Sequence, residues 1–490
     1  MIMLWHNISW QAMPVLLPLV GAMLCFLLPQ RIKFLGLMIA LAIAASVFAL
    51  LLQVLDEGVL RYSVGGWGAP LGIDLYTDGL SLLMLLMTAL VGLGISIYAI
   101  AYFKSDKAVH FWPLWMLLWA ALNALFLSAD LFNLYVTLEL LGLSAVALVA
   151  LAGGANALGA AMRYLFVSLL GSLFYLLGLA LLYHSFATVD IALLAQRIEE
   201  TPAVWAAMGL MSAGLLLKTA LFPLHFWLPP AHANAPAPVS ALLSALVVKA
   251  SFYILLRLWL DVFPPTNSML VQFLGLLGAC AVLWGGLQAL RQTRLKMLIA
   301  YSTVAQLGYL FIAFPLATGM AWKGSLYLLI SHALAKSAMF LAAGNLLRFG
   351  GHDRITQLDR VAQRLPLTLA AFALAGVSIM GLPPSGGFIG KWLLLDVALR
   401  SGQWWWAVIL MLGSLLAAAY IFKVIGHAFT QAEVAHEAIE VSKMMEWSAF
   451  LLALAAIVLG LVSPWPLALM DIGSPFNTAL SATCTSGVAQ

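Results

Sequence analysis

Long apolar stretches separated by short polar segments follow one another along the whole chain. Within each stretch the hydrophobic residues are continuous and do not alternate with polar ones, which favours membrane-spanning helices over the strands of a β-barrel. A span with its loop takes roughly 30–35 residues, so a chain of 490 residues has room for about 14 spans. We predict spans at 12–29, 34–55, 77–102, 111–128, 131–151, 161–183, 204–227, 239–259, 270–290, 297–315, 324–347, 367–399 (broken), 404–429 and 446–470.

The composition narrows the class of protein further. Hydrophobic residues make up 64% of the chain and charged residues 9%, which is typical of an all-α polytopic membrane protein. The net charge of +4 is too small to indicate a nucleic-acid partner. The cysteines Cys25, Cys280 and Cys484 lie far apart and form no CxxC motif, so we expect no iron–sulfur or zinc framework. We expect no cofactor, because no nucleotide, haem or flavin motif is present.

The beginning of the chain and its polar segments bear on domain organisation. The first apolar run, Met13 to Leu28, has no basic flank before it, so we interpret it as the first span and not as a signal peptide. No hydrophilic stretch is long enough for a soluble domain. We therefore predict that residues 1–490 form a single membrane domain.

Basic residues are distributed unequally between the two sets of loops. The loops after odd-numbered spans carry Arg31, Lys33, Lys104, Lys107, Arg163, Arg291, Arg294, Lys296, Arg348, Arg354, Arg360, Arg364 and Lys443. The loops after even-numbered spans carry only Arg61, Arg197, Lys323 and Arg400. By the positive-inside rule the first set faces the cytoplasm, and with 14 predicted spans both termini then lie outside it.

Prolines interrupt two of the apolar runs. Pro223 lies inside the seventh predicted span, and Pro383 and Pro384 divide the twelfth. Because proline removes a backbone donor and clashes with the preceding turn, such breaks survive in a membrane only where protein or a wet cavity surrounds them. Lys218 and Lys391 each lie close to one of these breaks.

Paired interruptions in two parts of a chain indicate an internally repeated transporter. We predict N-terminal helices over 1–105, a first repeat over 111–260, a second repeat over 270–430, and a C-terminal helix and tail over 446–490.

Five ionisable residues lie inside the apolar runs: Glu139, Lys218, Lys249, Lys336 and Lys391. A charged side chain at the bilayer centre costs at least ~2.5–3.5 kcal/mol on insertion scales. Five such residues in a chain with so few charges form a pattern, and groups that can each hold or release a charge are what a proton or cation relay needs. Glu139 could instead be a carboxyl kept neutral by burial, and the lysines could merely hold helices together.

Three histidines are weaker candidates. His332 lies four residues before Lys336 and shares its helix face, which suits a relay pair, although a core histidine beside an interfacial lysine would look the same. His225 and His232 flank the first break and could take up protons or cap the interface. We do not expect them to bind zinc, because no third ligand is close in sequence. Asp74 lies near a predicted span end, and we expect a structural role for it.

Four segments together resemble a known family. They are 217–249, with Lys218, Pro223, His225, Pro229, His232 and Lys249, then 295–309, 332–340 and 381–391. This pattern is similar to that of the antiporter-like membrane subunits shared by respiratory complex I, membrane-bound hydrogenases and Mrp-type Na⁺/H⁺ antiporters. The resemblance runs from about Asp74 to Lys423.

The resemblance implies roles for particular residues. It implies that Glu139 on the fifth span pairs with Lys218 on the seventh. It also implies that Lys249 is the central lysine and that Lys391 is the last charged group. One complex I subunit typically has glutamate at that last position. Together with the Gly65–Gly72 run and the absence of a long C-terminal lateral helix, Lys391 makes the chain most like the D-type subunit of the Mrp antiporters.

The resemblance also implies the fold and the activity. The fold would be two inverted five-helix repeats. Protons would be taken up from the cytoplasm near the first break, pass along Lys218, Lys249 and His332 or Lys336, and leave at Lys391, with Glu139 modulating Lys218. The chain would be a subunit of a hetero-oligomeric Na⁺(or K⁺)/H⁺ antiporter in a bacterial inner membrane, and a transporter more than a catalytic chain. The alternatives are a proton-pumping subunit of an NADH–quinone oxidoreductase or hydrogenase, and a passive scaffold.

Overall fold

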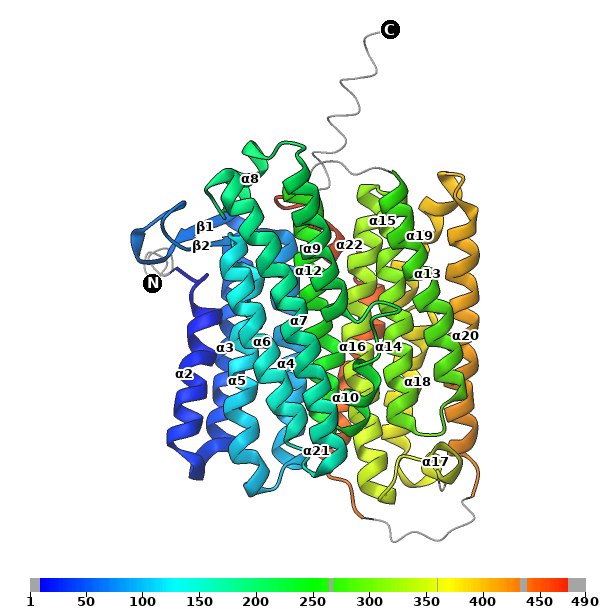
Figure 1. Cartoon of the computed structure of the whole chain (residues 1–490). Coiled ribbons are helices and arrows are strands. Elements are labelled where there is room, and N and C mark those ends of the chain that lie inside the picture. Colours follow the sequence, from blue (N-terminus) through cyan, green and yellow to red (C-terminus); the bar gives the residue numbers. More distant parts are fainter. Residues whose placement is uncertain (1–8, 264–267, 359, 432–438, 475–490) are drawn as a thin grey trace.

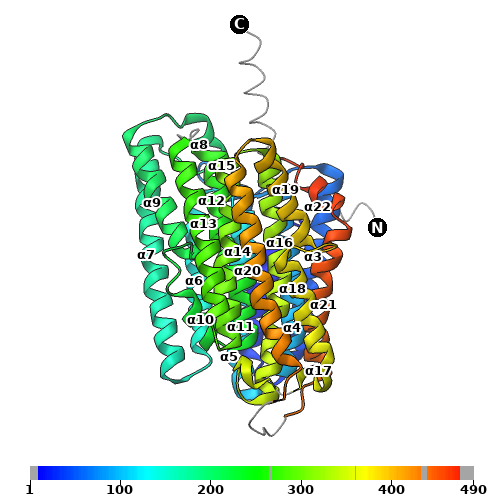
Figure 2. The ribbon, with the colours of Figure 1, turned by 90° about the vertical axis from the view of Figure 1, so that its right-hand side faces the viewer.

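The computed structural model describes residues 9–263, 268–358, 360–431 and 439–474. Long helices stand side by side in one bundle (Figure 1), and a quarter turn shows the same upright packing (Figure 2). Over the described residues, twelve helices are long and apolar enough to cross a membrane. The predicted all-α polytopic fold is therefore confirmed. Two further apolar helices, Met13–Leu27 and Pro366–Met380, are shorter, and the count of about fourteen spans stays a prediction.

The described helices up to residue 262 belong to the N-terminal part and the first predicted repeat. They are α2 (Met13–Leu27), η1 (Pro29–Arg31), α3 (Ile32–Glu57), η2 (Val64–Gly66), α4 (Gly79–Tyr102), α5 (Ser105–Leu127), α6 (Leu131–Ala150), α7 (Gly154–Phe186), α8 (Ile191–Arg197), α9 (Pro202–Thr219), α10 (Leu228–Asn234), α11 (Ala237–Leu242), the π-helix η3 (Leu243–Val247), α12 (Val248–Arg257) and the π-helix η4 (Leu258–Val262).

The second predicted repeat and the C-terminal part follow. They are α13 (Ser268–Arg291), α14 (Leu295–Phe311), α15 (Ala313–Leu316), α16 (Gly319–Gly350), η5 (Ile355–Gln357), α17 (Val361–Arg364), α18 (Pro366–Met380), α19 (Gly386–Arg400), α20 (Trp404–Ala428), α21 (Lys443–Leu461) and α22 (Pro464–Leu469).

Several predicted boundaries need correction. Helices α5, α7 and α16 begin at Ser105, Gly154 and Gly319, before the predicted starts at 111, 161 and 324. The span predicted over 204–227 ends as helix α9 at Thr219, because the chain turns there before the prolines. The span predicted over 446–470 is divided into α21 and α22, with Pro464 at the first position of α22.

A small β-hairpin was not predicted. Strands β1 (Leu60–Ser63) and β2 (Asp74–Thr77) pair antiparallel, and the glycine-rich Gly65–Gly72 run forms the connection between them. Period-two alternation over four residues is too short a signal to stand out beside the long apolar runs.

Close packing of small residues fixes the helices around the first break. A Cβ atom added to Gly214 of α9 would lie 2.3 Å from the backbone oxygen of Gly171 on α7, and one added to Gly171 would lie 3.0 Å from Cγ of Lys218. Only glycine permits this approach of two backbones, as is common between helices in membranes. The glycine pair therefore brings α7 against the helix that carries Lys218.

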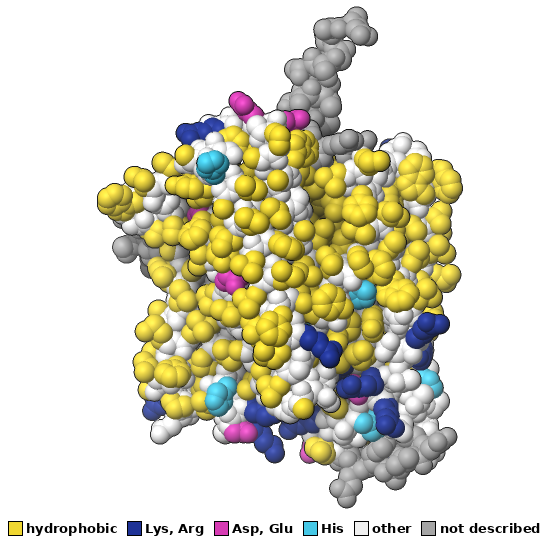
Figure 3. Space-filling model, viewed as in Figure 1, with side chains coloured by type: hydrophobic (Ala, Val, Ile, Leu, Met, Phe, Trp, Pro, Cys, Tyr) yellow, Lys and Arg dark blue, Asp and Glu magenta, His cyan; other side chains and the backbone are white. Residues whose placement is uncertain are grey.

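The two ends of the bundle differ in charge. Gln11, before α2, donates from Nε2 to Thr77 Oγ1 of the hairpin over 2.9 Å, and Ile472, after α22, accepts from the amide of Gly79 over 2.8 Å. Both ends of the described chain therefore lie on the hairpin side, at the top in Figure 1. Most Lys and Arg side chains visible in Figure 3 gather toward the opposite end.

Candidate functional site

The first break lies in the middle of the bundle. Helix α9 ends where Ala220 adopts a left-handed backbone with φ of 58°, and a turn carrying Pro223 leads to α10. The indole Nε1 of Trp227 donates to the carbonyl of Leu217 over 3.0 Å, and its ring stacks on Tyr164 with centroids 4.3 Å apart. These contacts hold the end of the turn against α7 and α9, whereas Pro223 and Phe226 within the turn are exposed on the surface of the subunit.

Lys218 occupies the last turn of α9 and pairs with a carboxylate. Its Nζ lies 3.4 Å from Glu139 Oε1 on α6, with side chains 7% and 22% exposed respectively. Nζ also donates to Ser168 Oγ on α7 over 3.2 Å. A cavity of about 10 Å³ lies beside the ammonium group, lined by Ser168 and Ser251 among others. Glu139 and Lys218, far apart in sequence, therefore meet as the resemblance implied.

The second break holds its lysine differently. Helix α18 ends at Met380, Gly381 follows with φ of 81°, and Ser385 caps the start of α19. The Nζ of Lys391 donates to the carbonyls of Ile379 and Met380 over 2.9 and 3.2 Å, and to Ser414 Oγ over 3.0 Å. A cation is favoured at the negative end of a helix dipole, so the end of α18 takes the place of a counter-ion.

Two further lysines lie between the breaks. Lys249, fully buried just after the π-helix η3, donates from Nζ to the carbonyl of Ser244. Lys336 of α16, also fully buried, donates to the carbonyl of Ile299 over 3.0 Å and to Ser302 Oγ. Among the described residues neither lysine lies within 4.0 Å of a carboxylate. Their protons are held by neutral oxygens only.

His332 lies among three of these lysines. The charges of Lys249, Lys336 and Lys391 all act on its imidazole, and its Nε2 is buried without a hydrogen-bond partner among the described residues. The imidazole is therefore within electrostatic reach of both the central lysines and the lysine of the second break.

His225 and His232 lie on either side of the start of α10, after the first break. His232 is fully buried and stacks on Phe340 with centroids 5.0 Å apart, and neither ring nitrogen has a partner in the described part of the chain. The charges of Lys296, Lys249 and Lys336 act on it. His225 stacks on Phe222 with centroids 5.6 Å apart, and its Nδ1 is also unpaired there.

Lys296 is a buried lysine that the sequence reasoning assigned to a cytoplasmic loop. It is 2% exposed, and its Nζ donates to the carbonyl of Ala235 after α10. It also lines a cavity of about 480 Å³ together with Lys104, Asp106 and Arg348. Lys296 is the second residue of α14 and lies close in sequence to two other basic residues, Arg291 at the end of α13 and Arg294 before α14, so the sequence did not indicate its burial.

Ion pairs secure the hairpin end. Arg257 of α12, which the sequence reasoning did not single out, contacts both carboxylate oxygens of Asp78 over 2.7 and 2.6 Å. Arg61 of β1 contacts Asp74 over 2.7 Å and Asp190 over 2.6 Å. Burial alone would raise the pKa of Asp74, but hydrogen bonds from Ser63 and Arg61 bring it below its usual value. Asp74 is in a structural position, as expected.

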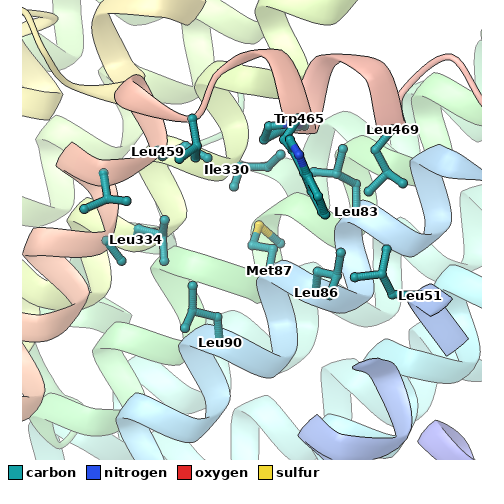
Figure 4. A pocket seen from close by; sticks show the side chains of 14 residues that line it. Leu51, Leu83, Leu86, Met87, Leu90, Ile330, Leu334, Leu459, Trp465 and Leu469 are labelled. Carbon is teal, nitrogen blue, oxygen red and sulfur yellow. The ribbon is translucent and has the colours of Figure 1, made fainter. Parts of the chain in front are cut away.

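A separate apolar groove of about 290 Å³ lies between α3, α4, α16, α21 and α22. Leucines, Met87, Ile330 and Trp465 point into it (Figure 4). None of the described residues that line the groove is ionisable, so it is not part of the row of lysines. In the described part of the chain, no group of three or more His, Cys, Asp or Glu residues could hold a metal ion.

Two family models match the chain. The model described as NADH:quinone oxidoreductase/Mrp antiporter, TM, covers residues 128–417, and that described as NADH-Ubiquinone oxidoreductase (complex I), chain 5 N-terminus, covers 66–111.

Curated relatives come from both branches of this family. The chain is 38% identical over 399 residues to NADH-quinone oxidoreductase subunit N of Desulforudis audaxviator, covering 80% of this chain and 79% of that one. It is 28% identical over 467 residues to the D-type subunit of the Na(+)/H(+) antiporter of Bacillus subtilis, covering 92% and 94%.

Solved structures extend the similarity to the whole fold. A chain of the Mrp complex from Dietzia sp. matches with a TM-score of 0.86 and 26% identity, over 95% of this chain and 98% of that one. A chain of respiratory complex I from Thermus thermophilus matches with a TM-score of 0.76 and 28% identity, over 94% and 99%. The family model spans more than half of the chain, and the chain therefore belongs to the NADH:quinone oxidoreductase/Mrp antiporter family of membrane proteins.

Proposed function

We propose that this chain is the proton-translocating membrane subunit of a multisubunit Na⁺(or K⁺)/H⁺ antiporter. The observation that carries this proposal is the row of buried lysines Lys218, Lys249, Lys336 and Lys391. Three of them are held by backbone carbonyls and hydroxyls instead of carboxylates. A lysine whose charge is not tied to a permanent counter-ion can lose and regain its proton, which a relay requires.

The proposed path begins at the cytoplasmic end. Protons enter the cavity beside Lys296 and reach the unpaired ring of His232, which lies under the influence of Lys249. The proton then passes to Lys218, whose pairing with Glu139 sets how firmly it keeps its charge, and from Lys218 to Lys249. From Lys249 the proton passes His332 or Lys336 and leaves through Lys391.

The arrangement of the two breaks supports two inverted repeats. In Figure 1 the first broken helix descends from α9 to α10, whereas the second ascends from α18 to α19. A long helix precedes each broken one, with only short helices between them: α7 has 33 residues and α16 has 32. The distribution of basic side chains supports a bacterial inner-membrane orientation with both termini on the external side.

A proton-pumping subunit of an NADH–quinone oxidoreductase or hydrogenase is the second candidate. The 38% identity to a subunit N favours it, whereas Lys391 and the nearly full-length match to the D-type antiporter subunit favour the antiporter. Purification of the native complex separates the two. Small antiporter subunits would accompany the chain in one case, and quinone-, flavin- or nickel-binding subunits in the other.

The relay is tested by Lys218→Ala in everted membrane vesicles. Ion exchange should be lost while the protein stays in the membrane, because removal of a buried charge lowers the cost of insertion. Lys33→Ala is the matched control, since Lys33 donates to the carbonyls of Ile100 and Phe103 at a helix end and lies outside the path. Normal exchange by Lys218→Ala at wild-type protein level would exclude the proposed role.

A further inference from the structure

Helix α7 carries a row of hydroxyl groups that leads away from Lys218 toward the hairpin end. Ser168, Ser172 and Tyr175 are spaced four and three residues apart, so they share one face of the helix. Ser168 accepts the hydrogen bond from Lys218 Nζ over 3.2 Å. The row therefore begins in direct contact with the Lys218–Glu139 pair.

The middle of the row contains an unsatisfied group. Ser172 is 2% exposed, and its Oγ has no hydrogen-bond partner among the described residues. Buried hydroxyls are normally paired, and one without a protein partner points to an ordered water. One helical turn away, Ser168 and Lys218 line a cavity of about 10 Å³, which is at the lower limit of the ~10–15 Å³ that one water occupies.

Tyr175 continues the row against α6. Its hydroxyl donates to the carbonyl of Leu131 over 3.2 Å, and its ring lies parallel to that of Tyr135, with centroids 6.4 Å apart. The charge of Asp130 acts on Tyr175, and that of Glu139 acts on Tyr135. The two tyrosines thus lie between the carboxylate of Glu139 within α6 and that of Asp130 at the start of α6.

Asp130 has a free oxygen at that outer end. Its Oδ1 caps α6 by accepting from the amide of Asn133 over 2.6 Å, whereas its Oδ2 is buried and has no partner in the described part of the chain. Burial raises the pKa of Asp130, the amides of Asn133 and Phe132 lower it, and the charges of Asp190 and Asp74 raise it further, so that it lies above its usual value. A second proton acceptor is therefore available here.

Asp130 adjoins an opening to the outer face. Its neighbours Ser128 and Ala129 line a cavity of about 370 Å³ together with Arg61, Arg257 and Asp261. Around Asp130, the carboxylates of Asp74 and Asp190 share the single guanidinium of Arg61. The local excess of negative charge favours the approach of cations, protons included.

We propose that these groups form a second outward proton path, confined to the first half of the molecule. It runs from the Lys218–Glu139 pair through Ser168, Ser172 and Tyr175 to Asp130 and the outer cavity. It rests on the proposed function, since its protons come from Lys218. Each hydroxyl accepts a proton on one side and donates one on the other, so no group is consumed. In this structure the Tyr175 hydroxyl is turned to the Leu131 carbonyl, and its rotation toward Asp130 joins the two ends.

Accessibility of Ser172 tests the path independently of transport. Cys25, Cys280 and Cys484 are replaced by serine, Ser172→Cys is introduced, and the assembled complex is exposed to Ag⁺ from the outside in right-side-out vesicles. The subunit is then denatured and its remaining thiol is titrated with a maleimide. We expect outside Ag⁺ to protect the thiol of Ser172→Cys from the maleimide.

Ser212→Cys is the matched control. Ser212 of α9 is also buried, with an unpaired hydroxyl among the described residues. It lies seven residues before Thr219, so the two share one face of α9. Because Thr219 Oγ1 bonds to Ser251 of α12, this face is turned to α12 and not to α7. Its thiol should remain open to the maleimide. Equal protection of both thiols, or protection of neither, would overturn the path.

A transport measurement adds a second arm. In a Lys391→Ala background the remaining outward flux should pass through the path, and adding Tyr175→Phe should reduce it about tenfold, equivalent to ~1.4 kcal/mol. Asp130→Asn, which keeps the helix cap, should reduce it similarly, whereas Ser212→Ala should not change it. Unchanged residual flux in both the Tyr175 and the Asp130 variants would overturn the path, even if Lys218→Ala abolishes exchange and the proposed function stands.

Discussion

The two breaks hold their lysines by different means. At the first, Lys218 faces the carboxylate of Glu139 and the hydroxyl of Ser168. At the second, Lys391 faces two carbonyls, the hydroxyl of Ser414 and the ring of Tyr309, whose centroid is 4.5 Å from Nζ. A carboxylate can be neutralised by a proton, whereas carbonyls and an aromatic ring keep a fixed polarity. The first lysine therefore has an adjustable partner and the second does not.

This difference suits opposite ends of a relay. A lysine that receives protons benefits from a neighbour whose charge responds to its own, because each can stabilise the other in turn. A lysine that releases protons benefits from a constant environment, in which only its own proton changes. The comparison leads to predictions for each half and for the groups that join them.

The largest effect is expected where the halves meet. Lys249→Ala removes the lysine that lies between the two halves. The carbonyl of Ser244 then loses the ammonium group that donates to it. Because a positioned proton carrier contributes roughly a hundredfold or more, the flux through the second half should be lost, and ion exchange in everted vesicles should fall at least about tenfold, to what the first half alone carries. Exchange above a tenth of wild type would show that the halves work separately.

The next largest effect is expected at Lys391, whose partners keep a fixed polarity. Lys391→Ala should reduce exchange about tenfold, equivalent to ~1.4 kcal/mol, with the remainder leaving through the first half. Lys391→Glu should be more active than Lys391→Ala and have a shifted pH optimum, because a carboxyl can carry a proton but is neutral when it does so. The measurement is flux against pH at matched expression. A fully active alanine variant would place the exit elsewhere.

Much of this could be predicted from the sequence, for physical reasons. Charges within apolar runs and prolines within spans are expensive in a membrane, so Glu139, Lys218 and Lys391 are conspicuous in the sequence alone. Lys296 is not conspicuous, because a lysine at a helix start beside other basic residues looks like a loop residue. Arg257 is not conspicuous either, because its partner Asp78 is 179 residues away in the sequence. The hydroxyl row of α7 was also missed, since serine and tyrosine are ordinary in membrane helices and only the fold shows that Ser172 lacks a partner among the described residues.

A smaller effect is expected at Glu139, the adjustable partner of Lys218. Glu139→Gln keeps the volume but cannot follow the charge of Lys218, so exchange should fall about fivefold, equivalent to ~1 kcal/mol. Glu139→Asp keeps the charge and should retain more activity than the amide. Vesicle exchange at equal protein levels compares them. If both variants behave like wild type, the pairing has no role in transport, and the contrast between the two breaks loses its functional meaning.

The smallest effect is expected at a buried carboxylate outside both breaks. Glu446 of α21 is 1% exposed and accepts from Lys443 over 2.9 Å and from Thr368 over 3.1 Å. Thr368 in turn accepts from Asn345, and Asn345 from Tyr98, over 3.1 and 3.0 Å. This chain of hydrogen bonds contains the amide of Asn345, which does not hand protons on as hydroxyls do. It contacts none of the four relay lysines, and it ties α21 to α18, α16 and α4.

Glu446→Gln should therefore leave ion exchange within about twofold of wild type while lowering the thermal stability of the purified protein, because a hydrogen bond to a charged acceptor contributes ~1.5–3 kcal/mol. The exposed ammonium of Lys443 remains solvated, so the substitution leaves no unpaired buried charge. Unfolding temperature and vesicle exchange are measured on the same preparation. A loss of exchange as large as that of Glu139→Gln, at unchanged stability, would mean that burial of a carboxylate, and not its contact with a relay lysine, is what transport depends on.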